Sequence, residues 1–387
     1  MSKTQILHIS DTHLGKRQYN LDFREQDVYD TFSQLIDIAI KEHVDGIIHT
    51  GDLFDINDPP NKAEIVAIRE LKRLKEAGIP FIVIAGDHDS PKKFTSIYPQ
   101  KILEEFDLIK FLSKPDTPYK LGDIAIYGIS HVPNVAKERL KELLSRLKPE
   151  NKKSILLLHQ GLKEVLPYEG AWQIQIDDLP KAFPYYALGH FHTRRVFQLD
   201  GGRIIEIAGS PDILREEEID GYEKEGKGAT LIDFSGDIPS IQKINIDVRK
   251  QYVVTLNTNN LKEEIRKLRE KYDTKNEKKP IFHIILEGKS IPKNILMKEL
   301  QEINNFAPYW RIYKDNTKEK DEKDVKIDLP TDTTIENLIY NYLVKIANFS
   351  EIEARIIVDI INRADEREYV KEELTKMIGV ENDNKKN

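Results

Sequence analysis

Aspartate and histidine recur in this chain directly after short apolar runs. The motifs are Asp11-Thr12-His13, Gly51-Asp52, Gly86-Asp87-His88-Asp89, His159-Gln160-Gly161 and Gly189-His190-Phe191-His192. Carboxylates and imidazoles without thiolates suit manganese and similar divalent ions. Two such ions held about 3.5–4 Å apart supply a nucleophile at neutral pH and neutralise phosphate oxygens. The residue types therefore predict a metal-dependent hydrolase.

The apolar runs explain how motifs that are far apart in sequence can meet. They span residues 6–9, 47–48, 81–85, 155–158 and 185–188. Short apolar runs bounded by turn residues are typical of buried parallel strands. In open α/β sheets, ligands bind beyond the carboxyl ends of the strands. One fold can therefore bring these Asp and His side chains to one place.

Composition narrows the class of protein. The length of 387 residues suggests two or three domains. Hydrophobic residues make up 39% of the chain, enough for a sizeable core, and charged residues make up 32%. The absence of cysteine excludes disulfides and thiolate zinc sites and favours a cytoplasmic protein. No run approaches the roughly 18 apolar residues of a membrane span, so no membrane partner is expected. The net charge of −7 requires that a nucleic acid be bound by local basic patches or through cations.

Periodicity divides the chain into four parts. Residues 1–236 alternate strand and helix and then become mostly β, which predicts an α/β fold with layered sheets covered by helices. Residues 240–313 restart as a βαβαβ unit, a small α+β domain without a ligand cluster. Residues 314–330 are almost entirely charged or polar, which is a linker composition. Residues 331–380 are helical again.

This last part contains two predicted helices with apolar stripes. Their starts fit capping boxes, formed by Thr333 with Glu336 and by Ser350 with Glu353. Two such helices beyond a solvated linker cannot bury both stripes alone. They either pack against the rest of the chain or form a helical hairpin that binds a partner.

In their order, the five motifs resemble the calcineurin-like metallophosphoesterase superfamily, whose pattern is D-x-H, G-D, G-N-H-D/E, H and G-H-x-H. The resemblance covers roughly residues 5–212. Further details are similar to the DNA double-strand-break repair nucleases of the meiotic recombination eleven family. These details are Leu14-Gly15, Arg24-Glu25, Leu53-Phe54 and Gln160.

The family resemblance implies an architecture and partners. It implies an αββα metallophosphoesterase sandwich at 1–236 and a DNA-binding capping domain at 240–313. After the linker, it implies a helix-loop-helix at 331–380 that binds a coiled-coil ABC-type ATPase. The activity implied is manganese-dependent exonuclease and endonuclease cleavage of double- and single-stranded DNA, carried out by a homodimer.

The resemblance also implies the roles of individual residues. Two Mn²⁺ ions would share Asp52, and His88 would be a catalytic residue that faces the phosphate and is not a ligand. The two ligand sets would be Asp11, His13, Asp52 and His192 for the first ion, and Asp52, Asp87, His159 and His190 for the second.

Two residues depart from the family pattern. Asp87 stands where asparagine is usual, and aspartate can bind a metal as asparagine does. Asp55 stands where a histidine is often found, which bears on any DNA-strand selectivity that this histidine provides.

Residues outside the motifs give weaker signals. The basic and aromatic loop with Lys16, Arg17 and Tyr19 suits contacts with phosphates and bases, although it could be an ordinary solvated loop. His8 and His49 lie within strand patterns and are expected in the core. His131 follows the apolar run 124–129 and could face the same edge, but it is not assigned to the site.

Two alternatives remain. The first is another calcineurin-like enzyme, such as a protein phosphatase or a cyclic-nucleotide phosphodiesterase. Protein phosphatases carry a Val-Asp-Arg-Gly type sequence after the second motif, where this chain has Leu53-Phe54-Asp55-Ile56. The second is a non-catalytic DNA-binding scaffold, which the filled ligand positions disfavour.

Overall fold

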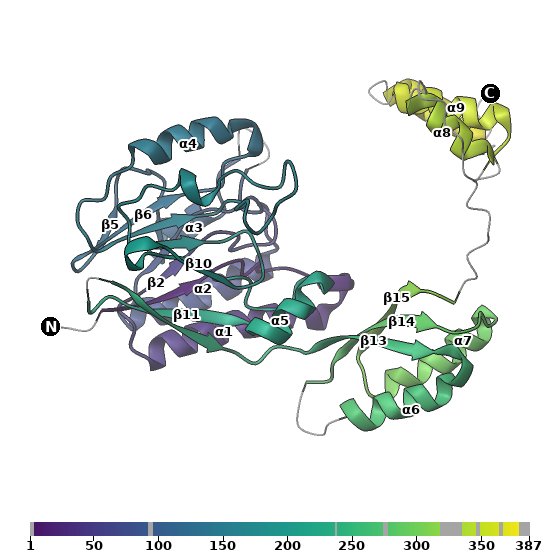
Figure 1. Cartoon of the computed structure of the whole chain (residues 1–387), viewed down its shortest axis with the longest axis horizontal. Coiled ribbons are helices and arrows are strands. Elements are labelled where there is room, and N and C mark those ends of the chain that lie inside the picture. The colour runs from purple at the N-terminus through teal and green to yellow at the C-terminus, as the bar shows by residue number, and fades with distance from the viewer. Residues whose placement is uncertain are drawn as a thin grey trace, which may run out of the picture. The chain divides into compact units, whose positions relative to one another are not determined.

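Two six-stranded sheets form a sandwich in the first part of the chain (Figure 1). In this computed structural model, residues 4–91, 96–236, 238–273, 278–317, 335–345, 349–363 and 367–378 are described. The chain divides into two units, residues 1–318 and 319–387. Within the described residues, no helix has the length and apolar character needed to cross a membrane.

The first sheet has the strand order β12-β11-β1-β2-β3-β4. Its strands are β1 (Gln5–Ile9), β2 (Gly46–His49), β3 (Phe81–Val83), β4 (Lys110–Phe111), β11 (Gly228–Asp233) and β12 (Ser240–Asn245). The second sheet has the order β5-β6-β7-β8-β10-β9. Its strands are β5 (Tyr119–Leu121), β6 (Ile124–Ile129), β7 (Ser154–Leu158), β8 (Tyr185–Leu188), β9 (Arg195–Gln198) and β10 (Ile204–Ile207).

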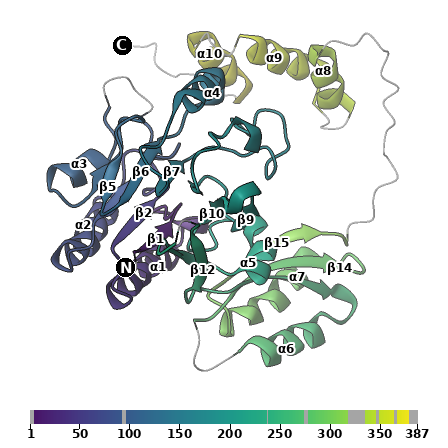
Figure 2. The ribbon, with the colours of Figure 1, turned by 60° about the vertical axis from the view of Figure 1, so that its left-hand side comes forward.

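Helices cover the outer faces of both sheets, as Figures 1 and 2 show. The first sheet packs against α1 (Asp22–Lys41), α2 (Asn61–Glu76) and α3 (Gln100–Glu105), and the second against α4 (Lys137–Arg146). A third cluster of apolar side chains, among them Ile48, Ile82 and Leu157, fills the space between the sheets. The αββα sandwich predicted from the sequence is therefore confirmed.

Strand direction determines where the sequence motifs meet. Strands β1, β2 and β3 are parallel to one another, and so are β6, β7 and β8. The carboxyl ends of parallel strands lie at one edge of a sheet. All five motifs follow these ends, so the sandwich brings them together at one rim.

A small second sheet-and-helix unit follows the sandwich, with its own apolar core. It consists of β13 (Gln251–Asn257), α6 (Leu261–Tyr272), β14 (Ile281–Glu287), α7 (Lys293–Leu300) and β15 (Tyr309–Asp315). The three strands are parallel, as the predicted βαβαβ order requires. We call this unit, residues 251–315, the capping domain.

The structure moves both predicted boundaries of the capping domain. Strand β12, at the start of the range 240–313, pairs with β11 of the sandwich and does not belong to the capping domain. Its alternating, largely exposed pattern is that of an edge strand, and sequence alone did not place it. At the other end, β15 continues to Asp315, two residues into the predicted linker 314–330. Residues 318–330 of that linker lie outside the described residues.

The unit formed by residues 319–387 is helical in its described part. It contains α8 (Ile335–Lys345), α9 (Glu351–Asn362) and α10 (Arg367–Ile378), and α9 contacts both other helices. The capping box of Ser350 and Glu353 is confirmed, whereas Thr333 lies outside the described residues. The prediction of only two helices was wrong. The charged sequence of α10 hides its few apolar residues.

Candidate metal centre

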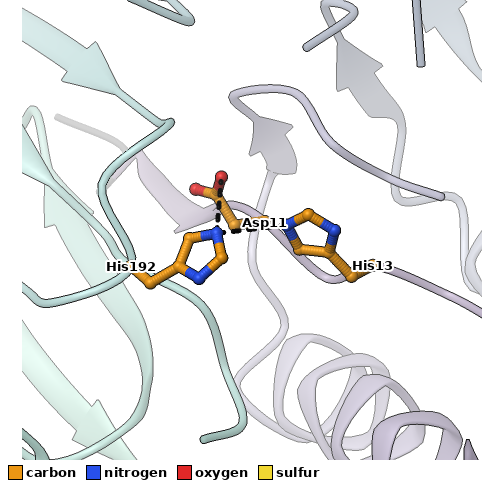
Figure 3. A group of neighbouring side chains, drawn as sticks. All are labelled: Asp11, His13 and His192. Carbon is orange, nitrogen blue, oxygen red and sulfur yellow. Dashed lines mark hydrogen bonds and ion pairs between the residues drawn. The ribbon is translucent and has the colours of Figure 1, made fainter. Parts of the chain in front are cut away.

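The rim of the sandwich gathers every predicted ligand. Asp11 and His13 follow β1, Asp52 follows β2, and the other motifs follow β3, β7 and β8. Four groups of ligand atoms form there, with all atoms of a group within 4.8 Å of one another. The groups are Asp11, His13 and His192; His13, Asp52 and His88; Asp11, Asp52 and His159; and Asp87, His131 and His190. Figure 3 shows the first of them.

The backbone turns sharply at these residues. Asp11, His13, Asp52 and His190 have φ values of 50°, 45°, 55° and 81°. Residues other than glycine rarely adopt positive φ, and such strain is concentrated at functional sites. A Cβ atom at Gly86 would lie 2.0 Å from Asp52 Oδ1, so only glycine fits beside the carboxylate. These short turns bring ligands from different strands within contact distance.

Asp52 lies between the two predicted ligand sets. Its Oδ2 is 3.6 Å from His13 Nε2 and 3.4 Å from His159 Nε2. Burial alone would raise the pKa of Asp52, but the charges of His159 and His13 and the hydrogen bond from His159 hold that pKa well below its usual range. An ionised carboxylate with neighbours on both sides has the geometry of a bridging ligand.

Asp87, the departure from the family pattern, takes part in the same cluster. Its Oδ1 is 3.1 Å from His159 Nε2 and 3.0 Å from His190 Nδ1. Burial opposes ionisation, yet hydrogen bonds and charges from these two histidines hold the pKa of Asp87 well below its usual range. The site therefore contains a second ionised carboxylate beside that of Asp52.

Hydrogen bonds from the opposite ring nitrogens orient three histidines. His159 Nδ1 lies 2.7 Å from the Thr50 carbonyl oxygen, and His13 Nδ1 lies 3.2 Å from Asp55 Oδ1. His192 Nδ1 lies 2.8 Å from Glu218 Oε1. If each Nδ1 donates its proton to these acceptors, each Nε2 faces the cluster with a free lone pair. Oxygen and imidazole donors in this arrangement fit divalent metal ions.

His88 faces the cluster from the side of Asp55. Its Nδ1 lies 2.6 Å from the Asp55 carbonyl oxygen, and its backbone N–H donates to Asp52 Oδ1 at 2.9 Å. The side chain is 29% exposed, whereas that of His13 beside it is buried. A partly exposed ring next to the Asp52 carboxylate can reach a bound substrate.

A cleft of about 430 Å³ opens onto the cluster. Six of its lining residues are predicted site residues or their neighbours: Asp52, Asp87, His88, His190, Phe191 and His192. Leu166 and Thr193 add further wall, and one side comes from a short turn with Arg215, Glu217 and Glu218. The cleft therefore gives access from solvent to predicted site residues, Asp52, Asp87 and His88 among them.

The loop with Lys16, Arg17 and Tyr19 is only partly a free surface. Lys16 Nζ pairs with Asp55 at 3.2 Å, beside the cluster. Tyr19 donates to Glu216 at 3.1 Å, and its ring stacks on Tyr309 of the capping domain with 5.0 Å between centroids. Much of this loop therefore joins the sandwich to the capping domain.

Sequence reasoning missed two residues of the site. His131 stacks on His190 with ring centroids 5.9 Å apart and joins the group of Asp87 and His190. Its position after the apolar run 124–129 was a usable signal. Glu218 contacts His192 from a short turn that comes well after the end of β10, and none of the sequence motifs includes it.

The fold and the donor set define a class of protein, and comparison with known families agrees. Residues 4–194 match the family model described as calcineurin-like phosphoesterase. That domain implies that the chain binds divalent metal ions.

Relatives along the whole chain narrow the class. The chain is 97% identical over 387 residues to the DNA double-strand break repair protein Mre11 of Sulfurisphaera tokodaii, covering 100% of both chains. It is 56% identical over 381 residues to the protein of the same name from Sulfolobus acidocaldarius, covering 97% of this chain and 99% of the relative. With the Saccharolobus solfataricus protein, identity is 53% over 379 residues, at the same coverage. The chain belongs to the Mre11 family of DNA double-strand break repair proteins and is a metal-dependent phosphoesterase.

Asp87→Asn tests the charge of the centre. The substitution removes one negative charge from the partly exposed edge of the cluster, where Asp87 contacts His159 and His190, so affinity for Mn²⁺ should fall on the order of tenfold. Calorimetric titration of the metal-free protein measures it. Asp220→Asn, which removes an exposed carboxylate from a surface pair with Lys224, is the matched control. Equal affinities of Asp87→Asn and the parent chain would mean that Asp87 acts as a neutral ligand.

Proposed function

We propose that this chain is a DNA exonuclease and endonuclease that depends on two Mn²⁺ ions. The observation that carries the proposal is the convergence of three carboxylates and four imidazoles from both sheets, with Asp52 between two sets. One ion would be held by Asp11, His13, Asp52 and His192. The other would be held by Asp52, Asp87, His159 and His190. We also propose that the protein acts in the cytoplasm.

The chain's own residues have distinct tasks in this proposal. Bound ions supply a nucleophile at neutral pH and neutralise charge on the phosphate. The short turns at Asp11, Asp52 and Gly86 hold the carboxylates in place against their mutual repulsion. His88, anchored at the Asp55 carbonyl oxygen, would face the phosphate and help the leaving oxygen depart.

The DNA strand would enter through the cleft. Lys16 at its Asp55 side would contact a phosphate, while Arg17 and Tyr19 would lie further along the path toward the capping domain. The capping domain would hold the rest of a double- or single-stranded substrate. Leu166 and Phe191 give the cleft apolar walls on which a sugar or base can pack.

Asp52→Asn and His88→Leu separate metal binding from proton transfer. Asp52→Asn should weaken both ions and lower manganese-dependent degradation of linear duplex DNA by several orders of magnitude, on the scale of 10³-fold or more. His88→Leu should lower degradation by about 10²–10⁴-fold and still bind two ions per chain.

The assay has a control for each alternative. Calorimetry counts the ions, and parallel reactions on circular DNA, a phosphopeptide and a cyclic nucleotide report on substrate class. Full DNA degradation by Asp52→Asn would refute the two-metal proposal. Faster turnover of the phosphopeptide or the cyclic nucleotide would favour another calcineurin-like enzyme, and DNA binding without any cleavage by the parent chain would favour a scaffold.

The helical unit at 331–380 is the proposed binding site for a coiled-coil ABC-type ATPase. In α8 and α9, Tyr342, Ile352 and Ile361 expose 55%, 73% and 48% of their surface. Apolar side chains at helical spacing suit a partner that is itself helical.

Truncation tests this assignment. A chain ending at residue 317 should keep its metal-dependent DNA degradation within about twofold, because the sandwich and the capping domain each have an apolar core that does not include the helical unit. The same chain should no longer elute with the ATPase on size-exclusion chromatography. Retention of the ATPase by the truncated chain would place the partner site elsewhere. Its melting temperature, measured beside that of the full chain, shows whether the remaining domains are folded.

We propose that the homodimer forms through α2 and the region of α3. Ile65 on α2 and Ile102 and Phe106 at α3 are 62%, 41% and 61% exposed. Lys75 of α2 donates to the Phe106 carbonyl oxygen at 3.4 Å, so the two segments adjoin. Exposed apolar side chains on two adjoining segments suit a twofold interface.

Introducing charge at these residues tests the dimer. Ile65→Glu with Phe106→Glu should convert dimer to monomer in sedimentation experiments, because burying two carboxylates without partners is costly. Ile295→Glu with Val253→Glu, two exposed apolar residues of the capping domain, is the matched control. A dimer that survives the first pair and dissociates with the control pair would move the interface to the capping domain.

A further inference from the structure

Glu218 is a buried carboxylate that the proposed chemistry leaves without a task. It ends the short 3₁₀ turn Glu216–Glu218 and is 5% exposed. Its Oε1 lies 2.8 Å from His192 Nδ1, and its Oε2 accepts from Ser210 Oγ at 3.0 Å and Leu214 N–H at 3.3 Å. Both oxygens are occupied, so the side chain has one well-defined position.

Lys227 completes a clamp around His192. It is buried, and its Nζ donates to Glu218 Oε2 at 2.5 Å, to Ser210 Oγ at 2.7 Å and to the His192 carbonyl oxygen at 2.9 Å. One ion pair thereby holds both the ring and the backbone of His192. Buried ion pairs are poor sources of stability, because desolvation offsets their attraction. Stability alone is therefore a weak reason for placing a pair at this histidine.

Glu216, two residues before Glu218, faces the capping domain. Its carboxylate accepts from the Tyr19 hydroxyl at 3.1 Å and pairs with Arg311 of β15 at 3.4 Å. The Tyr19 ring stacks on Tyr309, and the Arg311 guanidinium lies 5.5 Å from the Tyr19 centroid. This end of the turn is therefore attached to the capping domain.

A second contact attaches the beginning of the same segment. The Ile213 carbonyl oxygen accepts from Gln251 Nε2 of β13 at 3.0 Å and from Arg24 Nη2 of α1 at 2.9 Å. Asp212 accepts from the same Arg24 at 2.9 Å. Residues 212–218 thus touch the capping domain at two points and end at the carboxylate that holds His192.

We propose that Glu218 is the positioning residue of His192 and that segment 212–218 couples the docking of the capping domain to the metal centre. The inference rests on the proposed role of His192 as a ligand. It assigns the coupling to one ion, the one held by Asp11, His13 and His192, because the segment touches no ligand of the other set. Affinity for that ion and docking of the capping domain then depend on each other reciprocally.

The test uses paired variants of the full chain and does not depend on activity. Glu218→Leu with Lys227→Met removes both charges and the acceptor for His192. Glu218→Gln with Lys227→Met also removes both charges, but the amide oxygen can still accept from His192 Nδ1. Calorimetric titration with Mn²⁺ should show about tenfold weaker binding of one ion in the leucine pair, most of it restored in the glutamine pair. The second ion should bind within twofold of the parent chain.

The coupling has its own variant and control. Glu216→Ala removes the contacts with Tyr19 and Arg311, and it should lower the affinity for the same ion about fivefold. Glu225, the last residue of α5 (Ile219–Glu225), pairs with Lys243. Glu225→Gln removes this carboxylate and should leave the affinities for both ions unchanged.

Each outcome has a defined meaning. Equal loss in the leucine and glutamine pairs, or no loss in either, overturns the positioning role of Glu218. Unchanged affinity for that ion in Glu216→Ala overturns the coupling. A parent chain that binds fewer than two ions overturns the proposed function and this inference together, which separates that failure from the other two. Should the leucine pair fail to fold, Glu218→Asp gives the same test, because it keeps the charge beside Lys227 and withdraws the oxygen from His192.

Discussion

Concentrated negative charge in a buried place is the constraint on which the site depends. Asp11 and Asp52 are buried, and Asp87 lies partly exposed beside them, so repulsion among closely placed carboxylates is only partly screened by water. Burial would lower the pKa of His159, yet Asp52, Asp87 and Asp11 raise it well above its ordinary value. Positive charge is therefore favoured in this pocket. Divalent ions satisfy the same demand.

The sandwich withstands this repulsion because the ligands sit on short turns anchored in rigid strands. Positive φ at Asp11, Asp52 and His190 costs free energy, which the dry core between the sheets offsets. Asp89 helps to hold these turns in place. Its buried carboxylate accepts from the N–H groups of Gly86, Leu53 and Phe54, although burial raises its pKa to about 6. It thereby joins the turns after β2 and β3.

The sequence was informative where local pattern and tertiary position coincide. Apolar runs ending in Asp or His predicted the strands and brought all seven predicted ligands and His88 to one rim. It was uninformative where position depends on contacts between distant segments. Strand β12 and helix α10 carry too few apolar residues for a clear period, and Glu218 reaches His192 only through the folded arrangement of 210–227. Whether these residues bind metal stays a prediction.

Polar contacts form much of the joint between the sandwich and the capping domain, beside the stack of Tyr19 on Tyr309. Arg24 is fully buried against Asp27 and Asp212, and Arg249, just before β13, pairs with the same Asp27. A fused apolar interface would fix the capping domain permanently, since burial of apolar area is non-directional and strongly favourable. Buried ion pairs contribute little net stability but demand exact geometry. A joint of this kind favours one docked position without a large energetic commitment to it.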